Sequence, residues 1–234
     1  MEQMTLDNLR PENLSVIIRN RNEERWIGHC IQSVIDLVMK PEIIIVDNNS
    51  NDDSIGIVRN FMQDPMLDQT NSRNYTDIKI INIKDYTPGK SINLGIKHSE
   101  RKFVLILSAH CVLKKLDLPS LQSKVKNFCG IFGNQTPIWN GKKINKRYIW
   151  SHFSSSEIEN MYSEQEQRYF FHNAISFFEK KTLLDFPFDE FIQGKEDRYW
   201  INQRVDEGKN FLYDPSMAVD HHYTQSGNTW KGIG

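Results

Sequence analysis

Four short runs of mostly apolar residues, each followed by polar side chains, constrain the fold of this chain more than any other feature. Short runs rich in β-branched residues are typical of strands that are buried within a sheet. Strands of this kind are covered on both faces by other elements. The four runs are Leu14–Ile18 (LSVII), Glu42–Val46 (EIIIV), Ile78–Ile83 (IKIINI) and Phe103–Leu107 (FVLIL).

The segments between the runs have the patterns of helices. Apolar residues recur at helical spacing between Trp26 and Ile35. Capping residues precede a predicted helix over Ile55–Met62, and Pro88-Gly89 marks a turn before a helix over Ser91–Lys97. Strands that alternate with helices predict an α/β fold, with a Rossmann-like, mostly parallel sheet and helices on both faces.

The second half of the sequence is less regular. Residues 141–170 are polar and aromatic, and we expect helices and loops there. The other elements predicted in this half are a strand and turn in Phe128–Gln135, a strand at His172–Glu179, a helix over residues 193–207 and short strands at Phe211–Tyr213 and Met217–Val219.

Length, charge and cysteine content narrow the class of protein. A chain of 234 residues fits one domain. Its net charge of -1 supplies no basic field for nucleic acid, so no nucleic-acid partner is expected. The three cysteines form no CxxC pair, which makes a reducing cytoplasm the simplest location. No apolar run approaches the roughly 18 residues of a membrane-spanning helix, and the polar N-terminus does not resemble a signal peptide.

Three polar segments are expected to meet at one edge of the sheet. They follow the first, second and fourth strands, at Arg19–Glu24, Asp47–Ser54 and Ser108–Cys111. Ligands of open parallel sheets bind beyond the carboxyl ends of the strands. The sequence therefore predicts a binding site where these segments converge.

Six motifs, taken in order, resemble the inverting family 2 glycosyltransferases, which have the GT-A fold. The motifs are IIRNRNEE, VDNNSNDDS, PGKSINLGI, SAHC, GKEDRYW and HHY, spread over residues 14–223. The chain is most similar to a subgroup in which SAH replaces the usual Asp-x-Asp motif. The resemblance implies one GT-A domain over residues 1–234, with a nucleotide-binding half at about 14–115 and an acceptor-binding half at about 116–223.

The same resemblance implies a function. Such an enzyme moves a sugar from a nucleotide-diphosphate donor to a hydroxyl acceptor, in the synthesis of bacterial surface polysaccharide or glycoconjugates. The implied acceptor is a saccharide or a lipid-linked saccharide. The implied location is the cytoplasm, with contact to the inner face of the membrane left open.

The first two motifs supply the expected nucleotide-binding residues. By resemblance, Asn20, Arg21 and Glu23 line the nucleotide pocket, and Asp47 hydrogen-bonds the base or the ribose. A carboxylate accepts well from ribose hydroxyls or from a ring N–H. The family usually has a small hydroxyl residue and an aromatic residue where this chain has Asn20 and Arg21. The alternative interpretation of these loops is helix capping, for which their side chains are also suited.

The middle motifs supply the residues expected to bind the diphosphate. Lys90 can act there as a point charge, and Asn93 is expected to brace its loop. Ser108 and His110 belong to the SAH motif, in which His110 stands where the family's metal-binding Asp is found. Two interpretations of His110 remain open at this stage. It forms a Mn²⁺ or Mg²⁺ site with one late histidine, His221 or His222, of which His222 is slightly preferred, or it acts without metal as a protonated group.

Glu196 and Asp197 match the family's ED motif near the start of a helix. An inverting transfer needs a carboxylate that removes the proton of the acceptor hydroxyl. The resemblance assigns this role to Asp197, with Glu196 as its catalytic neighbour. Acidic pairs are also common at helix N-termini for electrostatic reasons alone.

Two other classes of function compete with a glycosyltransferase. A nucleotidyltransferase needs a glycine-rich phosphate loop after the first strand, and IIRNRNEE contains no glycine. A non-catalytic module that binds a sugar or a nucleotide is compatible with the loss of Asp-x-Asp, but the ED pair favours an enzyme.

Overall fold

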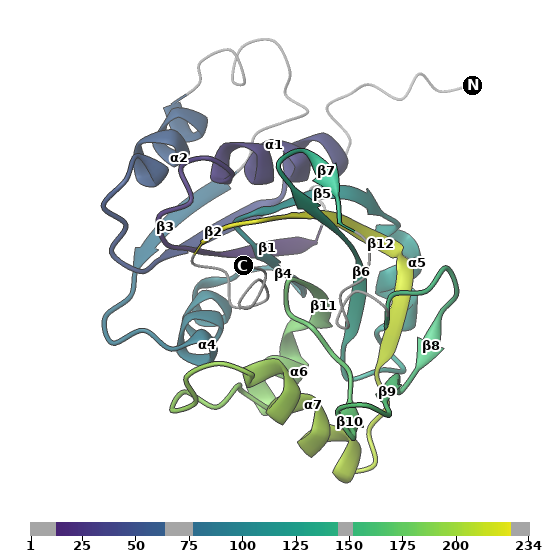
Figure 1. The fold of residues 1–234 in the computed structure, drawn as a ribbon. Coiled ribbons are helices and arrows are strands. Elements are labelled where there is room, and N and C mark those ends of the chain that lie inside the picture. Colours follow the sequence, from purple (N-terminus) through teal and green to yellow (C-terminus); the bar gives the residue numbers. More distant parts are fainter. Residues whose placement is uncertain (1–12, 64–76, 145–151, 226–234) are drawn as a thin grey trace, which may run out of the picture.

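The computed structural model describes residues 13–63, 77–144 and 152–225 (Figure 1). In its first half the elements are β1 (Leu14–Asn20), α1 (Ile27–Leu37), β2 (Glu42–Asp47), α2 (Ser54–Gln63), β3 (Asp77–Asn82), α4 (Pro88–His98), β4 (Phe103–Ser108), β5 (Cys111–Leu116) and α5 (Leu118–Lys124). In its second half they are β6 (Ile131–Trp139), β7 (Lys142–Lys143), β8 (Ile158–Glu159), β9 (Tyr162–Ser163), β10 (Arg168–Tyr169), β11 (Ile175–Glu179), α6 (Lys180–Asp185), α7 (Glu196–Asp206) and β12 (Leu212–His222).

One central sheet organises the molecule. Its strand order is β3-β2-β1-β4-β11-β6-β12-β5, and the first four of these strands pair in parallel. β11 runs antiparallel to β4 and β6, whereas β12 is parallel to β6 and antiparallel to β5. The predicted α/β class, with a mostly parallel sheet between helices, is confirmed.

Side chains of the buried strands alternate between two cores. Val16 and Ile18 point into the core that contains α1, and Ile17 points into the core that contains α4 and α7. Figure 1 shows α1 and α2 on one side of the sheet, and α4, α6 and α7 on the other. This alternation follows from the two-residue period of a strand, and it explains why β1 is apolar throughout its middle.

The register of the parallel strands brings the polar segments together. Asn20 of β1 lies opposite Asp47 of β2, and Arg19 lies opposite Ser108 of β4. The ends of three strands thus place four polar side chains in neighbouring positions. The edge predicted from the sequence to bind a ligand is formed by this register.

Several elements of the second half differ from the sequence prediction. β5, α5 and α6 were not predicted, and the described residues between 152 and 170 contain the short strands β8, β9 and β10 rather than long helices. The two short strands expected after residue 210 are one long strand, β12. The Asp214-Pro215-Ser216 segment looks like a break, but the sheet accommodates it as an irregularity between Asp214 and Ala218.

The helix predicted over residues 193–207 begins at Glu196. Gly194 and Lys195 have φ angles of 107° and 63°, so they cannot extend the helix toward the N-terminus. Among the described residues, none of the helices combines the length and apolar content needed to cross a bilayer.

A buried carboxylate connects several elements near the amino ends of the parallel strands, at the opposite end from the predicted site. The Glu42 side chain has no exposed surface, and it accepts hydrogen bonds from Lys79 Nζ at 2.7 Å, from the Glu100 N–H at 2.8 Å and from Ser15 Oγ. Burial by itself raises the pKa of Glu42, but these hydrogen bonds outweigh it and hold the pKa below its usual value.

We therefore expect Glu42→Gln to lower the free energy of unfolding by about 1.5–3 kcal/mol at neutral pH, since it removes hydrogen bonds to a charged group. A carboxyl whose pKa is lowered by folding stabilises the fold above its unfolded pKa of about 4.3, and this contribution is lost as the pH falls through the folded pKa. Urea unfolding should show that the difference between the wild type and Glu42→Gln shrinks in acid.

Glu100→Gln is the matched control, because Glu100 bonds the same Lys79 Nζ at 2.6 Å but its side chain is 70% exposed. An exposed ion pair contributes less than about 1 kcal/mol. A difference for Glu42→Gln that stays constant across this pH range would contradict the assigned role.

Candidate active site

The loops that follow β1 and β2 are joined by hydrogen bonds into one surface. The N–H of Asn22 donates to Ser50 Oγ at 2.9 Å, and the N–H of Asn51 donates back to Asn22 Oδ1 at 2.8 Å. A further bond of 2.9 Å runs from the Glu24 N–H to Asp52 Oδ2. Short Asn, Ser and Asp side chains satisfy backbone groups that no strand or helix uses. Asp52, whose side chain also bonds the N–H of Ser54 at the start of α2, therefore connects the two loops.

Asp47 ends β2 and is only 2% exposed. Its Oδ1 atom accepts from Asn20 Nδ2 at 2.8 Å and from Ser50 Oγ at 2.6 Å, and its Oδ2 atom accepts from the Ser50 N–H at 3.0 Å. A carboxylate offers about four acceptor positions. Three bonds therefore hold the loop in place and leave Asp47 limited capacity for a ligand.

Asn20 and Arg21 differ in their exposure. Asn20 is 2% exposed, and its Oδ1 atom has no hydrogen-bond partner among the described residues. The amide cannot be turned around without loss, because its Nδ2 atom donates to Asp47. Arg21 is exposed to solvent. This part of the chain thus has one buried acceptor, Asn20 Oδ1, next to Asp47 and one exposed cation, Arg21, in the loop that follows β1.

A chain of hydrogen bonds connects Glu23 to the SAH segment and to β12. His110 Nδ1 lies 3.0 Å from Glu23 Oε1, and His110 Nε2 lies 3.1 Å from His221 Nε2. On its other side, His221 Nδ1 lies 2.8 Å from Gln135 Oε1. The three sequence candidates Glu23, His110 and His221 therefore meet at one place.

Proton counting limits the protonation states of this chain. The Ala174 N–H points at His172 Nδ1, so that nitrogen accepts, and the amide of Gln135 presents Nε2 to it and Oε1 to His221. His110 Nδ1 then donates its proton to Glu23 Oε1, and His221 Nδ1 donates its proton to Gln135 Oε1. The two Nε2 atoms face each other and need one more proton between them. Burial, followed by the charge of His110, holds the pKa of His221 well below its usual value. The Glu23 carboxylate lies 3.0 Å from the other ring nitrogen of His110.

His222 points away from this pair. Its ring stacks on Trp26 at a centroid distance of 3.9 Å, and its backbone N–H donates to the His110 carbonyl at 2.9 Å. Adjacent residues of a strand project to opposite faces. The expectation that one late histidine meets the SAH segment agrees with the structure, but the preference for His222 over His221 is wrong.

The residues named for a metal site do not fit a Mn²⁺ or Mg²⁺ centre built by the protein. Mg²⁺ requires oxygen ligands in octahedral geometry, and His110 and His221 present only two nitrogen atoms. In the described ranges of the chain, no three His, Cys, Asp or Glu side chains are grouped so that they could hold a metal ion. Glu23 lies on the far ring nitrogen of His110 and does not join the pair.

Lys90 and Asn93 lie near the start of α4. Lys90 is partly exposed in the first turn, where its N–H bonds the capping oxygen Thr87 Oγ1 at 3.1 Å. Asn93 braces the segment before α7, because its amide bonds the backbone of Phe188 in both directions, at 2.8 and 3.0 Å. Glu190 Oε1 accepts a third bond at 3.0 Å. Asn93 thus braces the segment around Phe188, whereas the sequence predicts that it braces its own loop, and its contact with nucleotide stays a prediction.

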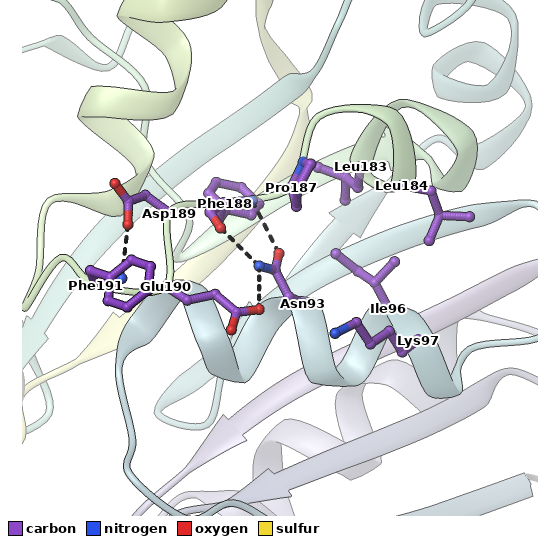
Figure 2. Close-up of a pocket in the computed structure, with 10 residues that line it drawn as sticks. All are labelled: Asn93, Ile96, Lys97, Leu183, Leu184, Pro187, Phe188, Asp189, Glu190 and Phe191. Atoms are coloured by element: carbon purple, nitrogen blue, oxygen red, sulfur yellow. Dashed lines mark hydrogen bonds between the residues drawn. The ribbon is translucent and has the colours of Figure 1, made fainter.

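A pocket of about 530 Å³ lies on the outer side of this brace. Figure 2 shows Ile96, Leu183 and Leu184 on one side and Phe191 on the other, with Asn93 between them. Of the predicted site residues, only Asn93 lines it. The pocket is therefore separate from the strand ends where His110 and Asp47 lie.

Glu196 and Asp197 open α7 and are 6% and 8% exposed. Asp197 Oδ2 accepts from the Asn173 N–H at 3.1 Å, and its Oδ1 accepts from the Arg198 N–H at 2.8 Å. Burial raises the pKa of both carboxyls above their usual values, although these N–H bonds oppose it at Asp197. A carboxylate with a raised pKa is a stronger base than an exposed one.

One functional residue was missed in the sequence. Arg19 Nη1 donates to Glu196 Oε1 at 2.8 Å, with side-chain exposures of 17% and 7%. The signal that could have identified it is a charged residue at the end of an otherwise buried strand. Such residues are rarely buried without a partner, and its partner here is 177 residues away.

Comparisons with known proteins give one family and one group of similar structures. The model of the family described as Glycosyl transferase family 2 matches residues 15–188. This match includes the loops after β1, β2 and β4 but ends before Glu196. No curated protein gives a significant match to the chain.

Crystal structures of S. aureus TarS are similar in fold. TarS 1-349 in complex with UDP-GlcNAc has a TM-score of 0.67 and 18% identity, with 94% of this chain and 61% of that chain covered. The complex with UDP gives 0.65 and 19%, with coverage of 90% and 60%. A further TarS structure gives 0.63 and 19%, with coverage of 91% and 37%. This chain thus spans about three-fifths of TarS 1-349, and identity at this level shows the fold alone.

Proposed function

The chain belongs to glycosyl transferase family 2, and from this premise we propose that it transfers a sugar from a nucleotide-diphosphate donor to a hydroxyl acceptor with inversion at the anomeric carbon. The observation that carries the proposal is the buried pair Glu196 and Asp197 at the start of α7, next to the edge where β1 and β4 end. The alternative of a non-catalytic binding module gives no reason to bury two adjacent carboxyls there.

In the proposed mechanism, Asp197 accepts the proton of the acceptor hydroxyl as that oxygen attacks the anomeric carbon. Its two N–H bonds, from Asn173 and Arg198, fix the carboxylate in one orientation. The N-terminal end of α7 favours the ionised form, while burial maintains basicity. Glu196 places a second carboxylate next to Asp197 in the sequence, and this carboxylate is paired with Arg19.

The leaving nucleoside diphosphate needs positive charge. We assign this role to His110, whose Nε2 atom shares a proton with His221 Nε2, and to Lys90 in the first turn of α4. The side chains of His110 and His221 do not fit a protein-built Mn²⁺ or Mg²⁺ centre, so the positive charge in this proposal comes from the protein. Ser108 adds a hydroxyl at the end of β4.

The nucleotide is proposed to bind over the joined loops, with Asp47, Asn20, Arg21 and Glu23 around it. UDP is the first nucleotide to test, because TarS was crystallised with UDP and with UDP-GlcNAc. The acceptor is proposed to be a saccharide or a lipid-linked saccharide of surface polysaccharide synthesis. We propose one catalytic domain, with donor and acceptor halves joined near residue 115, at work in the cytoplasm or at the inner face of the membrane.

Calorimetric titration with UDP, CDP, GDP, dTDP and CMP tests the donor site. Each nucleotide is added with Mn²⁺, with Mg²⁺ or with EDTA. We expect one nucleoside diphosphate to be preferred, and its binding to survive EDTA. Asp47→Asn should weaken this binding, whereas the exposed neighbour Asp53 can be changed to Asn without effect.

Other outcomes of this titration are informative. Binding that EDTA abolishes would replace the cationic role of His110 with a metal ion held partly by the nucleotide. An absence of binding for every nucleotide and metal, by a folded protein, would contradict the donor site and favour a module that binds something else.

A further inference from the structure

The Arg19–Glu196 ion pair joins the two halves of the molecule. Arg19 lies at the carboxyl end of β1, opposite Ser108, and Glu196 is the first residue of α7. Their hydrogen bond of 2.8 Å is largely shielded from water, with the side chains 17% and 7% exposed. A buried charge without its partner is strongly unfavourable. The pair therefore constrains the distance between β1 and the start of α7.

The charge of Arg19 also acts on the neighbouring carboxyl. Burial raises the pKa of Glu196 and of Asp197, and the guanidinium of Arg19 opposes this rise at both. In return, although burial lowers the pKa of Arg19, the nearby Glu196 keeps it above its usual value. Arg19 thus remains a cation and favours the ionised form of the acidic pair.

Other elements bring further charged groups toward the pair, and at Asp197 the charge of Arg198 acts in the same direction as that of Arg19 and more strongly. The pKa of His172 is lowered to about 3, mainly by burial, so this ring stays neutral near neutral pH. Within the described parts of the chain, Arg19 is the only cation that forms an ion pair with Glu196. The groups that face Arg19, Glu196 or Asp197 are Tyr86 before α4, Arg168 on β10, His172 before β11 and Arg198 on α7, and the two arginines share Glu166.

We propose that Arg19 is a positioning residue for transfer: by holding Glu196, it fixes the start of α7 against β1 and thereby sets the place of Asp197. Its charge also favours the ionised form of Asp197, which is the form that acts as a base. This inference rests on the proposed function, in which Asp197 deprotonates the acceptor. Arg19 itself needs no contact with donor or acceptor.

The pH profile of kcat/KM, which reports groups of the free enzyme, tests this role in Arg19→Met and Arg19→Lys. An opposite charge close to an aspartate lowers its pKa by about 1–3 units. In Arg19→Met the midpoint of the acid limb should therefore move to higher pH, because Arg19 is one of the two arginines whose charge lowers the pKa of Asp197. In Arg19→Lys the midpoint should lie close to the wild-type value, because the positive charge is kept. The kcat should stay low, because an ammonium does not reproduce the geometry of the guanidinium.

The double variant Arg19→Met/Glu196→Gln guards against loss of folding, since it removes both charges together. It should fold and still lose kcat, because the start of α7 is no longer fixed. Arg204→Met is the matched control. Arg204 is 3% exposed and pairs with Glu207 at 2.7 Å near the other end of α7. In Arg204→Met the midpoint of the acid limb of kcat/KM should stay at its wild-type value.

Titration of the Glu196 and Asp197 carboxyls by carbon NMR gives a readout that does not depend on transfer. An unmoved titration in Arg19→Met, or an equal shift in Arg204→Met, would overturn the inference. Failure of the wild type to transfer any sugar would overturn the proposed function instead, and the NMR titration would still decide whether Arg19 controls the pair.

Discussion

Asp197→Asn is expected to lower kcat by about 10²–10⁴-fold, which is the usual contribution of a general base. The amide keeps the size and shape of the side chain, and its oxygen can still accept one of the two N–H bonds. It cannot take a proton from the acceptor hydroxyl. The affinity for the nucleoside diphosphate should stay within a few fold of the wild type, as measured by calorimetry.

Asp206→Asn is a suitable control, because Asp206 ends the same helix and is exposed. Glu196→Gln should have a smaller effect than Asp197→Asn, since it leaves the proposed base in place and alters only its neighbour. Full transfer by Asp197→Asn would show that the base is another residue, while full transfer by both variants would remove the acidic pair from the mechanism.

His110→Ala should lower kcat by about 10²–10³-fold, the loss found when one group that stabilises developing negative charge is removed. The variant removes the proton that His110 shares with His221 and leaves Glu23 without its ring partner. Initial rates of sugar transfer, measured with the preferred donor at saturating acceptor, give the size of this loss.

His98→Ala provides the control, because His98 is exposed at the end of α4. If added Mn²⁺ restores His110→Ala, or if EDTA inactivates the wild type, then charge at the diphosphate comes from a metal ion. A variant with wild-type kcat would mean that the Glu23–His110–His221 chain only supports the loops.

The elements of the chain up to the end of β4 were predicted more accurately than those that follow. Leu14–Ile18 and Phe103–Leu107 became strands β1 and β4 with extensions of one or two residues. Their pattern is strong because the strands are buried on both faces. In β5, by contrast, Lys114 and Lys115 interrupt the apolar pattern, and the strand is held by pairing with β12. Long-range pairing of this kind leaves little local signal.

The site shows the same division. Asp47, His110 and Asp197 were proposed from motifs that resemble family 2, and the structure places each of them at or next to the end of a strand or a helix. The motifs did not identify Arg19, and they favoured His222 over His221. Both questions depend on which face of a strand meets a distant element, and a shift of one residue in register reverses the answer.

By itself, the sequence determined the alternation of strands and helices, the polar edge of the sheet and the family of this protein. The first two properties depend on local composition and period, which each segment carries alone, whereas the family follows from the resemblance of the motifs. Only the tertiary structure decided that Arg19 pairs with Glu196, that His221 meets His110 and that Asp47 is largely occupied by its own loop. Each of these contacts joins residues brought together by packing and register, and their energies depend on burial that no single segment specifies.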